Sequence, residues 1–164
     1  MSIVITPIAA EHVDGFHRAL DMVARERKYL ALLEAPPLAA TRQFISDNIA
    51  KGHAQFVAVA DGEVVGWCDV LPRGQPVHAH VGVLGMGLVP QFRGRGHGTA
   101  LIDAALGAAK QRGLTRTQLS VHADNASAIR LYEKVGFKTE GRLPDAVLID
   151  GQFTDLIVMG RLDR

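Results

Sequence analysis

The sequence has little of several features that define whole classes of protein. Its 164 residues include one cysteine, Cys68, so no disulfide can form within the chain, and a zinc site built from cysteines is not expected. The sequence has eighteen basic and seventeen acidic residues, which gives a formal net charge of +1. This balance lacks the strongly basic face of nucleic-acid-binding proteins. No stretch reaches the ~18 consecutive apolar residues that a membrane-spanning helix needs.

The start of the chain, Met1 to Pro7, lacks the basic start and apolar run of a signal peptide. With one cysteine and no membrane segment, we expect a cytoplasmic protein with neither a membrane nor a nucleic acid as partner. The length suits one domain over residues 1–164, and a hydrophobic content of 48% is enough for a core.

The hydrophobic pattern predicts a mixture of helices and strands. Thr41 is expected to cap the second helix, after the break at Ala35-Pro36-Pro37. Helices are predicted near residues 10–31, 41–49, 99–112 and 125–135, and strands near residues 3–5, 56–60, 64–70, 81–89, 117–121, 146–149 and 153–159. This order, with hairpins around one strand–helix–strand–helix unit, predicts a single α/β (α+β) domain.

A glycine-rich turn, Arg93 to Thr99, joins a predicted strand to a predicted helix. Gly94, Gly96 and Gly98 alternate, so no Cβ hinders the approach of a ligand to the backbone. The first backbone amides of the helix lack hydrogen-bond partners. They point outward at the positive end of the helix dipole, which favours the binding of a phosphate. An ordinary turn is the alternative. A P-loop would need a lysine, and a dinucleotide fingerprint would need a carboxylate about 20 residues on; neither is present.

Two sequence blocks together resemble the GNAT family of N-acetyltransferases. The first is Val89-Pro90 followed by Arg93-Gly94-Arg95-Gly96-His97-Gly98, and the second runs from Asn125 to Phe137 with the pattern N-x-x-A-x-x-L-Y-x-x-x-G-F. The resemblance covers residues 55–160 well. It implies a mixed, mainly antiparallel sheet that splays at the cofactor strand and is flanked by helices, with acetyl-CoA as the acyl donor and no metal.

The resemblance also implies which residues hold acetyl-CoA. The pantetheine arm would pair with the backbone of Leu88 and Val89, and the pyrophosphate would sit on the amides from Arg93 to Thr99. The cofactor-binding residues implied are Leu88, Val89, Arg93, Gly94, Arg95, Gly96, His97, Gly98, Thr99, Asn125, Ser127 and Tyr132. The backbone N–H of Leu88 would hold the oxyanion. Tyr132 would protonate the departing thiolate, although its place in an apolar helical stripe also suits a core tyrosine.

The general base is where this sequence departs from the family. Many relatives carry a glutamate on the cofactor strand, whereas Leu84 to Gly87 contains no ionisable group. Three candidates remain, His80, Asp69 and Glu34, each of which also suits an ordinary structural or surface role, and a water chain to one of them is a further option. His78, His80 and His97 lack a clear third ligand, so no metal site is expected.

These observations leave more than one function open. The first hypothesis is an N-acetyltransferase that moves an acetyl group from acetyl-CoA to a primary amine by direct attack in a ternary complex. The acceptor would be a small amine, an amino acid or a protein N-terminus. The second is a catalytically idle acyl-CoA-binding or sensing module, and the third is a nucleotide-binding protein. Homodimers are common among similar proteins, and this sequence leaves the oligomeric state open.

Overall fold

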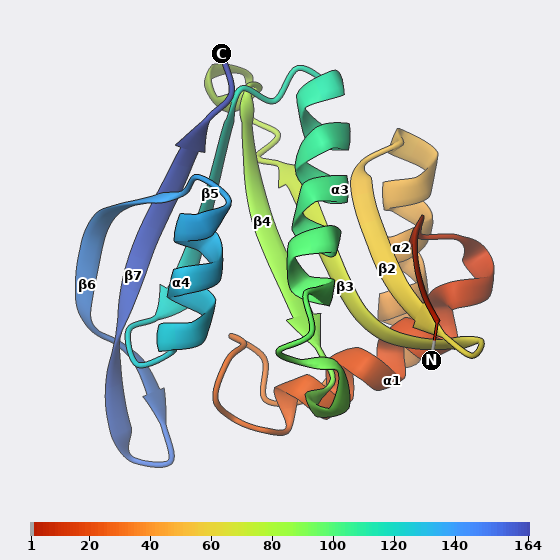
Figure 1. Ribbon diagram of the computed structural model, residues 1–164, viewed down its shortest axis with the longest axis horizontal. Helices are drawn as coiled ribbons and strands as arrows, with labels where there is room; N and C mark the ends of the chain where they lie inside the picture. Colours follow the sequence, from red (N-terminus) through yellow and green to blue (C-terminus); the bar gives the residue numbers. More distant parts are fainter. Residues whose placement is uncertain (1) are drawn as a thin grey trace.

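The computed structural model describes residues 2–164 and contains one seven-stranded sheet with the order β1-β2-β3-β4-β5-β7-β6 (Figure 1). The strands are β1 (Ile3–Pro7), β2 (Ala54–Ala60), β3 (Glu63–Pro72), β4 (Val81–Leu88), β5 (Arg116–His122), β6 (Lys138–Ile149) and β7 (Gln152–Leu162). The helices are α1 (Val13–Ala24), α2 (Leu38–Lys51), α3 (His97–Gln111) and α4 (Ala126–Lys134), with short 3₁₀ turns at Ala10–His12, Pro76–His78 and Pro90–Phe92.

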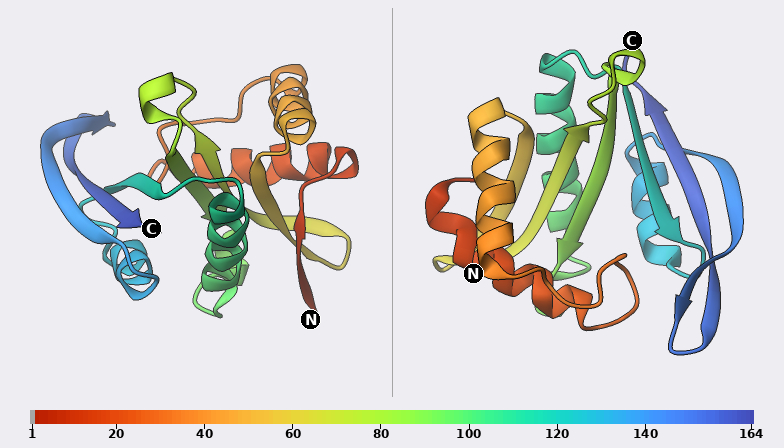
Figure 2. Two further views of the ribbon diagram at one scale, coloured as in Figure 1. Left: turned by 90° about the horizontal axis from the view of Figure 1, so that it is seen from above. Right: turned by 180° about the vertical axis from the view of Figure 1, so that it is seen from behind.

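The helices cover the two faces of the sheet. Helices α1 and α2 lie on one face and α3 and α4 on the other (Figure 2). The buried residues of α1 include Val13, Phe16 and Val23, at the three- and four-residue spacing of one helical face. In the same way Leu101 and Ala105 of α3 turn toward the sheet. The predicted fold class, a mixed and mainly antiparallel sheet flanked by helices, is confirmed.

The ends of the elements differ from the sequence-based predictions in three places. Helix α1 ends at Ala24 rather than near residue 31, and α2 begins directly after Pro37, whose fixed φ suits the start of a helix. Thr41 therefore lies inside α2, and its predicted capping role is wrong. The strand predicted at 146–149 begins at Lys138. Most of β6 is exposed, so it lacks the alternation by which strands are recognised in a sequence.

The sheet splays between β4 and β5. These two parallel strands share only three register pairs, Val81 with Arg116, Gly82 with Thr117 and Val83 with Gln118. Beyond Val83 they diverge, as the separation of the green and teal strands shows in Figure 1. Pro90 follows the end of β4, so the split begins several residues before this proline. The gap leaves the last residues of β4 without a neighbouring strand on the β5 side.

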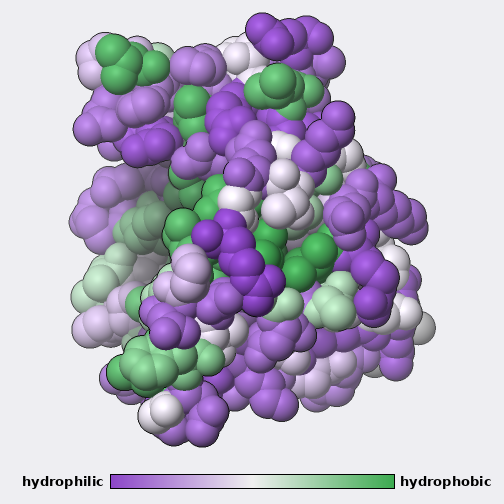
Figure 3. Space-filling view, turned by 90° about the vertical axis from the view of Figure 1, so that its left-hand side faces the viewer, coloured by the Kyte–Doolittle hydropathy of each residue, from purple (hydrophilic) through white to green (hydrophobic). Residues whose placement is uncertain are grey.

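The core lies between the sheet and its helices. Trp67 is buried and meets Phe16 edge-on, with ring centroids 5.6 Å apart. Seen from the side of β6, the molecule shows apolar surface in the middle of the face, bordered by hydrophilic side chains (Figure 3). Among residues 2–164, no helix is long and apolar enough to cross a membrane.

Candidate active site

A cavity of about 370 Å³ lies at the splay. Four segments form its wall: the end of β4, the glycine turn with the start of α3, the start of α4, and α1 with the loop that follows it. The lining residues are Val23, Tyr29, Met86, Gly87, Leu88, Arg93, Gly94, Gly96, Gly98, Thr99, Asn125, Ser127, Ala128, Leu131, Tyr132 and Lys134. Two segments more than 25 residues apart in the sequence, predicted to bind one ligand, therefore share one cavity.

The glycine turn owes its shape to left-handed backbone conformations. Gly94 has a φ of 74° and Gly96 a φ of 88°, and a Cβ added at either position would meet no atom within 4 Å. Glycine adopts these conformations at little cost, and the surface beside the backbone stays bare. Gly98 has a different role, because a Cβ there would lie 3.1 Å from Leu131. It allows α3, α4 and β4 to meet closely at one end of the cavity.

The backbone of β4 presents polar groups to the gap. The N–H of Val89 donates to the carbonyl of Val65 at 2.9 Å. Because bonded and non-bonded pairs alternate in an antiparallel ladder, the N–H and C=O of Leu88, paired in register with Gly66, point away from β3 and toward the splay. The carbonyl of Val89 accepts from Phe92 at 3.0 Å. Val89 therefore has both backbone groups occupied. Because Arg93 Nε donates to the carbonyl of Leu88, the N–H of Leu88 is the backbone group that remains for a ligand.

Arg93 holds the cavity wall together through its side chain. Its Nε donates to the carbonyl of Leu88 at 2.9 Å, and both terminal nitrogens donate to the carboxylate of Glu26, at 2.9 and 2.5 Å. The guanidinium also lies 4.9 Å from the centroid of the Tyr29 ring, within reach of a cation–π interaction. Arg93, which was predicted to bind phosphate, thus already contacts β4, the residue Glu26 after α1, and Tyr29.

The other basic residues of the turn lie outside the cavity lining. Arg95 is exposed, and His97 is tilted against Phe92 with ring centroids 6.3 Å apart. The turn therefore contributes its glycines and Thr99 to the wall, together with the backbone around them.

Helix α4 supplies the polar groups on the opposite wall. The side-chain Oδ1 of Asn125 accepts from the N–H of Ala128 at 3.2 Å and from the hydroxyl of Ser127 at 3.3 Å, which caps the helix. Tyr132 packs edge-on against Phe137 at 5.9 Å and is buried, yet it lines the cavity. Burial raises the pKa of Tyr132 above its usual value, so the hydroxyl stays protonated at neutral pH.

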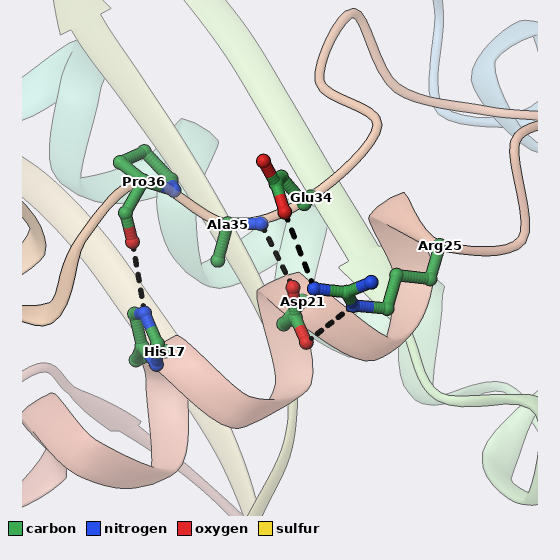
Figure 4. A network of polar contacts seen from close by, with 6 residues as sticks. All are labelled: His17, Asp21, Arg25, Glu34, Ala35 and Pro36. Carbon is green, nitrogen blue, oxygen red and sulfur yellow. Dashed lines mark hydrogen bonds and ion pairs between the residues drawn. The ribbon is translucent and has the colours of Figure 1, made fainter.

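The three candidate bases all lie outside the cavity lining. His80 is exposed in the turn before β4, and Glu34 is exposed and pairs with Arg25 at 3.3 Å (Figure 4). Asp69 is buried on β3, opposite Gly85 in register, and accepts a hydrogen bond from Gln55 at 3.2 Å. Burial raises the pKa of Asp69 to about 7. Among the described residues 2–164, neither a carboxylate nor an imidazole lines the cavity.

Sequence reasoning missed part of the wall. Val23 and Tyr29 come from the N-terminal third of the chain, where no motif indicates a site, and Lys134 lies within the second block without a predicted role. Met86 and Gly87 line the cavity within the stretch that was noted only for its missing carboxylate. Within residues 2–164, no group of three or more histidine, cysteine or acidic side chains is placed to hold a metal ion.

Comparison with known proteins agrees with this geometry. Residues 19–137 match the model of the acetyltransferase (GNAT) family. The L-amino acid N-acetyltransferase AaaT of Escherichia coli K12 is 32% identical over 112 residues, which span 68% of this chain and 69% of that protein. An N-alpha-acetyltransferase of Sulfurisphaera tokodaii is 38% identical over 96 residues, which span 52% of this chain and 56% of that one.

The same fold is found among solved structures. The acetyltransferase yncA of Salmonella typhimurium, determined with acetyl-CoA, superposes with a TM-score of 0.93 at 16% identity, covering 100% of this chain and 95% of that one. The chain belongs to the acetyltransferase (GNAT) family, and the predicted family and enzyme class are confirmed.

Proposed function

We propose that the protein transfers an acetyl group from acetyl-CoA to a primary amine that it takes up in the neutral form. The observation that carries this proposal is that one cavity brings these parts together. The bare glycine turn, the end of β4, Tyr132, Val23 and Tyr29 all line it.

Each part of the cavity fits one part of acetyl-CoA. The turn offers unpaired amides at the N-terminus of a 15-residue helix, which suits a pyrophosphate. The N–H of Leu88 points into the splay, where an extended amide-containing arm can pair with it as an added strand would. Asn125 and Ser127 line the other side of the same passage. Acetyl-CoA, when bound, supplies the activated acyl group.

Tyr132 is the residue that we assign as proton donor to the departing thiolate. An ordinary thiol has a pKa of about 8.5 and a tyrosine of about 10, and burial widens this gap by raising the pKa of Tyr132. The tyrosine therefore stays protonated until negative charge develops on the sulfur. It then gives its proton to the thiolate as the C–S bond breaks, and it recovers a proton from the amine nitrogen, which loses one as the amide forms. A positioned acid of this kind contributes typically 10²–10⁴-fold in rate.

The absence of a base from the described lining indicates how the amine is prepared. With no carboxylate or imidazole in the wall within residues 2–164, an ammonium ion would have no nearby group to take its proton. The enzyme then depends on the neutral fraction of the amine in solution. We therefore expect kcat/KM to rise with pH along the ionisation of the acceptor itself.

The same observation favours a second candidate, a catalytically idle module that binds acyl-CoA. Such a module would keep the turn and β4 edge but would need neither a base nor Tyr132. Two of the relatives above are N-acetyltransferases, one for L-amino acids and one named for the α-amino position, which supports the transferase and a primary amine as acceptor.

One experiment separates the two candidates. Release of free thiol from acetyl-CoA is measured across a panel of amino acids, small amines and short peptides, for the wild type and for Tyr132→Phe. We expect turnover with at least one amine and a loss of about 10²-fold or more in kcat for the variant, while its affinity for acetyl-CoA stays within about threefold. Tight binding of acetyl-CoA without turnover on any amine would establish the idle module instead.

A further inference from the structure

We propose that residues 25–37, which we call the strap, close the acceptor end of the cavity and restrict the acceptor to a free small amine, excluding the N-terminus of a polypeptide. This inference rests on the proposed function and names its substrate class. The strap leaves the end of α1 and crosses below the splay toward the β6–β7 hairpin before it returns to α2 (Figures 1 and 2).

Two consecutive residues tie the strap to elements on the two sides of the splay. Glu26 accepts hydrogen bonds from both terminal nitrogens of Arg93, in a half-buried ion pair. Arg93 belongs to the stretch from Met86 to Thr99, which we call the cofactor wall. Arg27 donates through Nε and Nη2 to the two carboxylate oxygens of Asp150, at 2.9 and 2.6 Å. Asp150 forms the turn of the β6–β7 hairpin, so the two ties bridge the splay from one side to the other.

Both residues of the second tie, Arg27 and Asp150, have an unusual backbone conformation. Arg27 has a φ of 58° and Asp150 a φ of 52°, left-handed conformations that most side chains avoid. For Asp150 the hairpin turn explains it, since Asp150 and Gly151 form a two-residue connection with φ positive at both positions. No hairpin explains Arg27. Arg27 lies just beyond the end of α1, and its conformation accompanies the change of direction by which residues 26 and 27 reach Arg93 and Asp150.

The returning part of the strap is fastened to α1 (Figure 4). Asp21 accepts the N–H of Ala35 at 2.9 Å and the Nε of Arg25 at 2.8 Å, and His17 Nε2 lies 2.8 Å from the carbonyl of Pro36. Arg25 also reaches Glu34 at 3.3 Å. The strap is therefore held at both walls and along its return, and Tyr29, at its middle, lines the cavity.

This arrangement matters for a long acceptor more than for a short one. An extended chain spans about 3.3–3.6 Å per residue, so the third residue of a peptide whose amine reached the thioester would need an open groove about 10 Å away. The strap borders the cavity at Tyr29, and its tie to the hairpin at Asp150 would obstruct a chain that left the cavity on this side. The cavity, about 370 Å³, is at the small end of the range for ligand pockets and must also admit the pantetheine arm.

The test compares a free amino acid with a hexapeptide that begins with the same residue. The acceptor is chosen from the amine panel, and kcat/KM is measured for both. For the wild type we expect a preference of about 100-fold or more for the free amino acid. In the double variant Arg27→Ala/Asp150→Ala, we expect this preference to fall two- to fivefold, the scale that an exposed ion pair supplies, with unchanged affinity for acetyl-CoA.

Two further variants make the result specific. The reversed pair Arg27→Asp/Asp150→Arg restores the tie with opposite charges and should return the preference toward the wild-type value. Arg18→Ala/Glu63→Ala removes another exposed ion pair, 3.8 Å long, whose residues do not line the cavity, and should leave the preference unchanged. Melting temperatures establish that each variant folds, and single Arg27→Ala replaces the double variant if that one does not.

The outcomes separate this inference from the proposed function. Equal use of hexapeptide and amino acid by the wild type overturns the strap's role and leaves the N-acetyltransferase intact. So does a double variant in which both substrates change by the same factor. A wild type that turns over neither substrate nor any amine in the panel overturns the proposed function itself, and the inference with it.

Discussion

The two walls of the cavity are built in different ways. The cofactor wall, from Met86 to Thr99, is one continuous stretch of chain whose shape depends on backbone: positive φ at Gly94 and Gly96, and the unpaired edge of β4. The acceptor wall, by which we mean Val23 of α1 and Tyr29 of the strap, is held in place by side-chain contacts between distant parts of the sequence. Glu26 and Arg93 are 67 residues apart in the sequence, and Arg27 and Asp150 are 123 apart.

The difference teaches where specificity resides. A wall of glycine and backbone amides recognises groups common to every CoA ester, and few side-chain changes there are neutral. A wall tied by exposed ion pairs is easily altered one residue at a time, because each pair contributes little to folding. We therefore expect changes in the cofactor wall to affect all acceptors equally, and changes in the acceptor wall to affect the choice among them.

The largest effect is expected for Gly96→Glu in the cofactor wall. The substitution forces a side chain into a φ of 88° and puts a carboxylate beside the amides that would hold a pyrophosphate. Like charges in such a site repel, and we expect acetyl-CoA affinity to fall about 100-fold by calorimetry, equally whichever acceptor is present.

Gly74→Glu is the matched control for that variant. Gly74 has the same φ of 88° and the same open space around it, but it lies in the loop after β3 and outside the cavity lining. It should suffer similar backbone strain and keep its affinity for acetyl-CoA. If Gly96→Glu bound acetyl-CoA as tightly as Gly74→Glu does, the turn would not be the pyrophosphate site.

An intermediate effect is expected for Arg93→Lys, because Arg93 joins the two walls. Lysine keeps the positive charge but lacks the planar fork that reaches Leu88 and Glu26 together. If bracing is the role of Arg93, both Arg93→Lys and Arg93→Ala should lower kcat/KM by about 10-fold. Steady-state kinetics with acetyl-CoA varied would decide this. If Arg93→Lys kept the wild-type kcat/KM while Arg93→Ala lost it, Arg93 would instead act only as a positive charge that attracts the phosphates.

The sequence predicted the two walls to different degrees. The turn was recognisable from its glycine spacing before a helix. The α4 block and Tyr132 were recognised only through the resemblance to the GNAT family, because the helical stripe alone also suited a core tyrosine. The strap was not, since nothing near Arg27 in the sequence indicates a partner at Asp150. Thr41 was misplaced because Pro37 starts α2 four residues earlier than the hydrophobic pattern. Asp69 is buried beside Gln55, which Asn48 of α2 contacts in turn, and strand periodicity does not reveal this network.

The smallest effect on turnover is expected for Asp69→Asn, which tests whether the buried Asp69 acts as the general base. Asp69 lies outside the cavity lining, and its neighbour in the sheet face, Trp67, covers Gly87. We expect kcat/KM to stay within about threefold of the wild type across the panel. A loss of 100-fold or more, with the fold intact, would make Asp69 the base and would place catalysis in both walls.

The same variant should change stability in a pH-dependent way. In the folded protein burial raises the pKa of Asp69 from 3.8 to about 7, so between these values the folded state holds a proton that the unfolded state has lost. Stability from this group is therefore full below pH 4 and decreases as the pH rises to about 7. Asparagine keeps the shape and can still accept from Gln55, so Asp69→Asn should melt several degrees above the wild type at pH 8. The gap should narrow toward pH 5 in thermal scans; a gap that stays constant with pH would mean that Asp69 is charged in the folded protein at neutral pH.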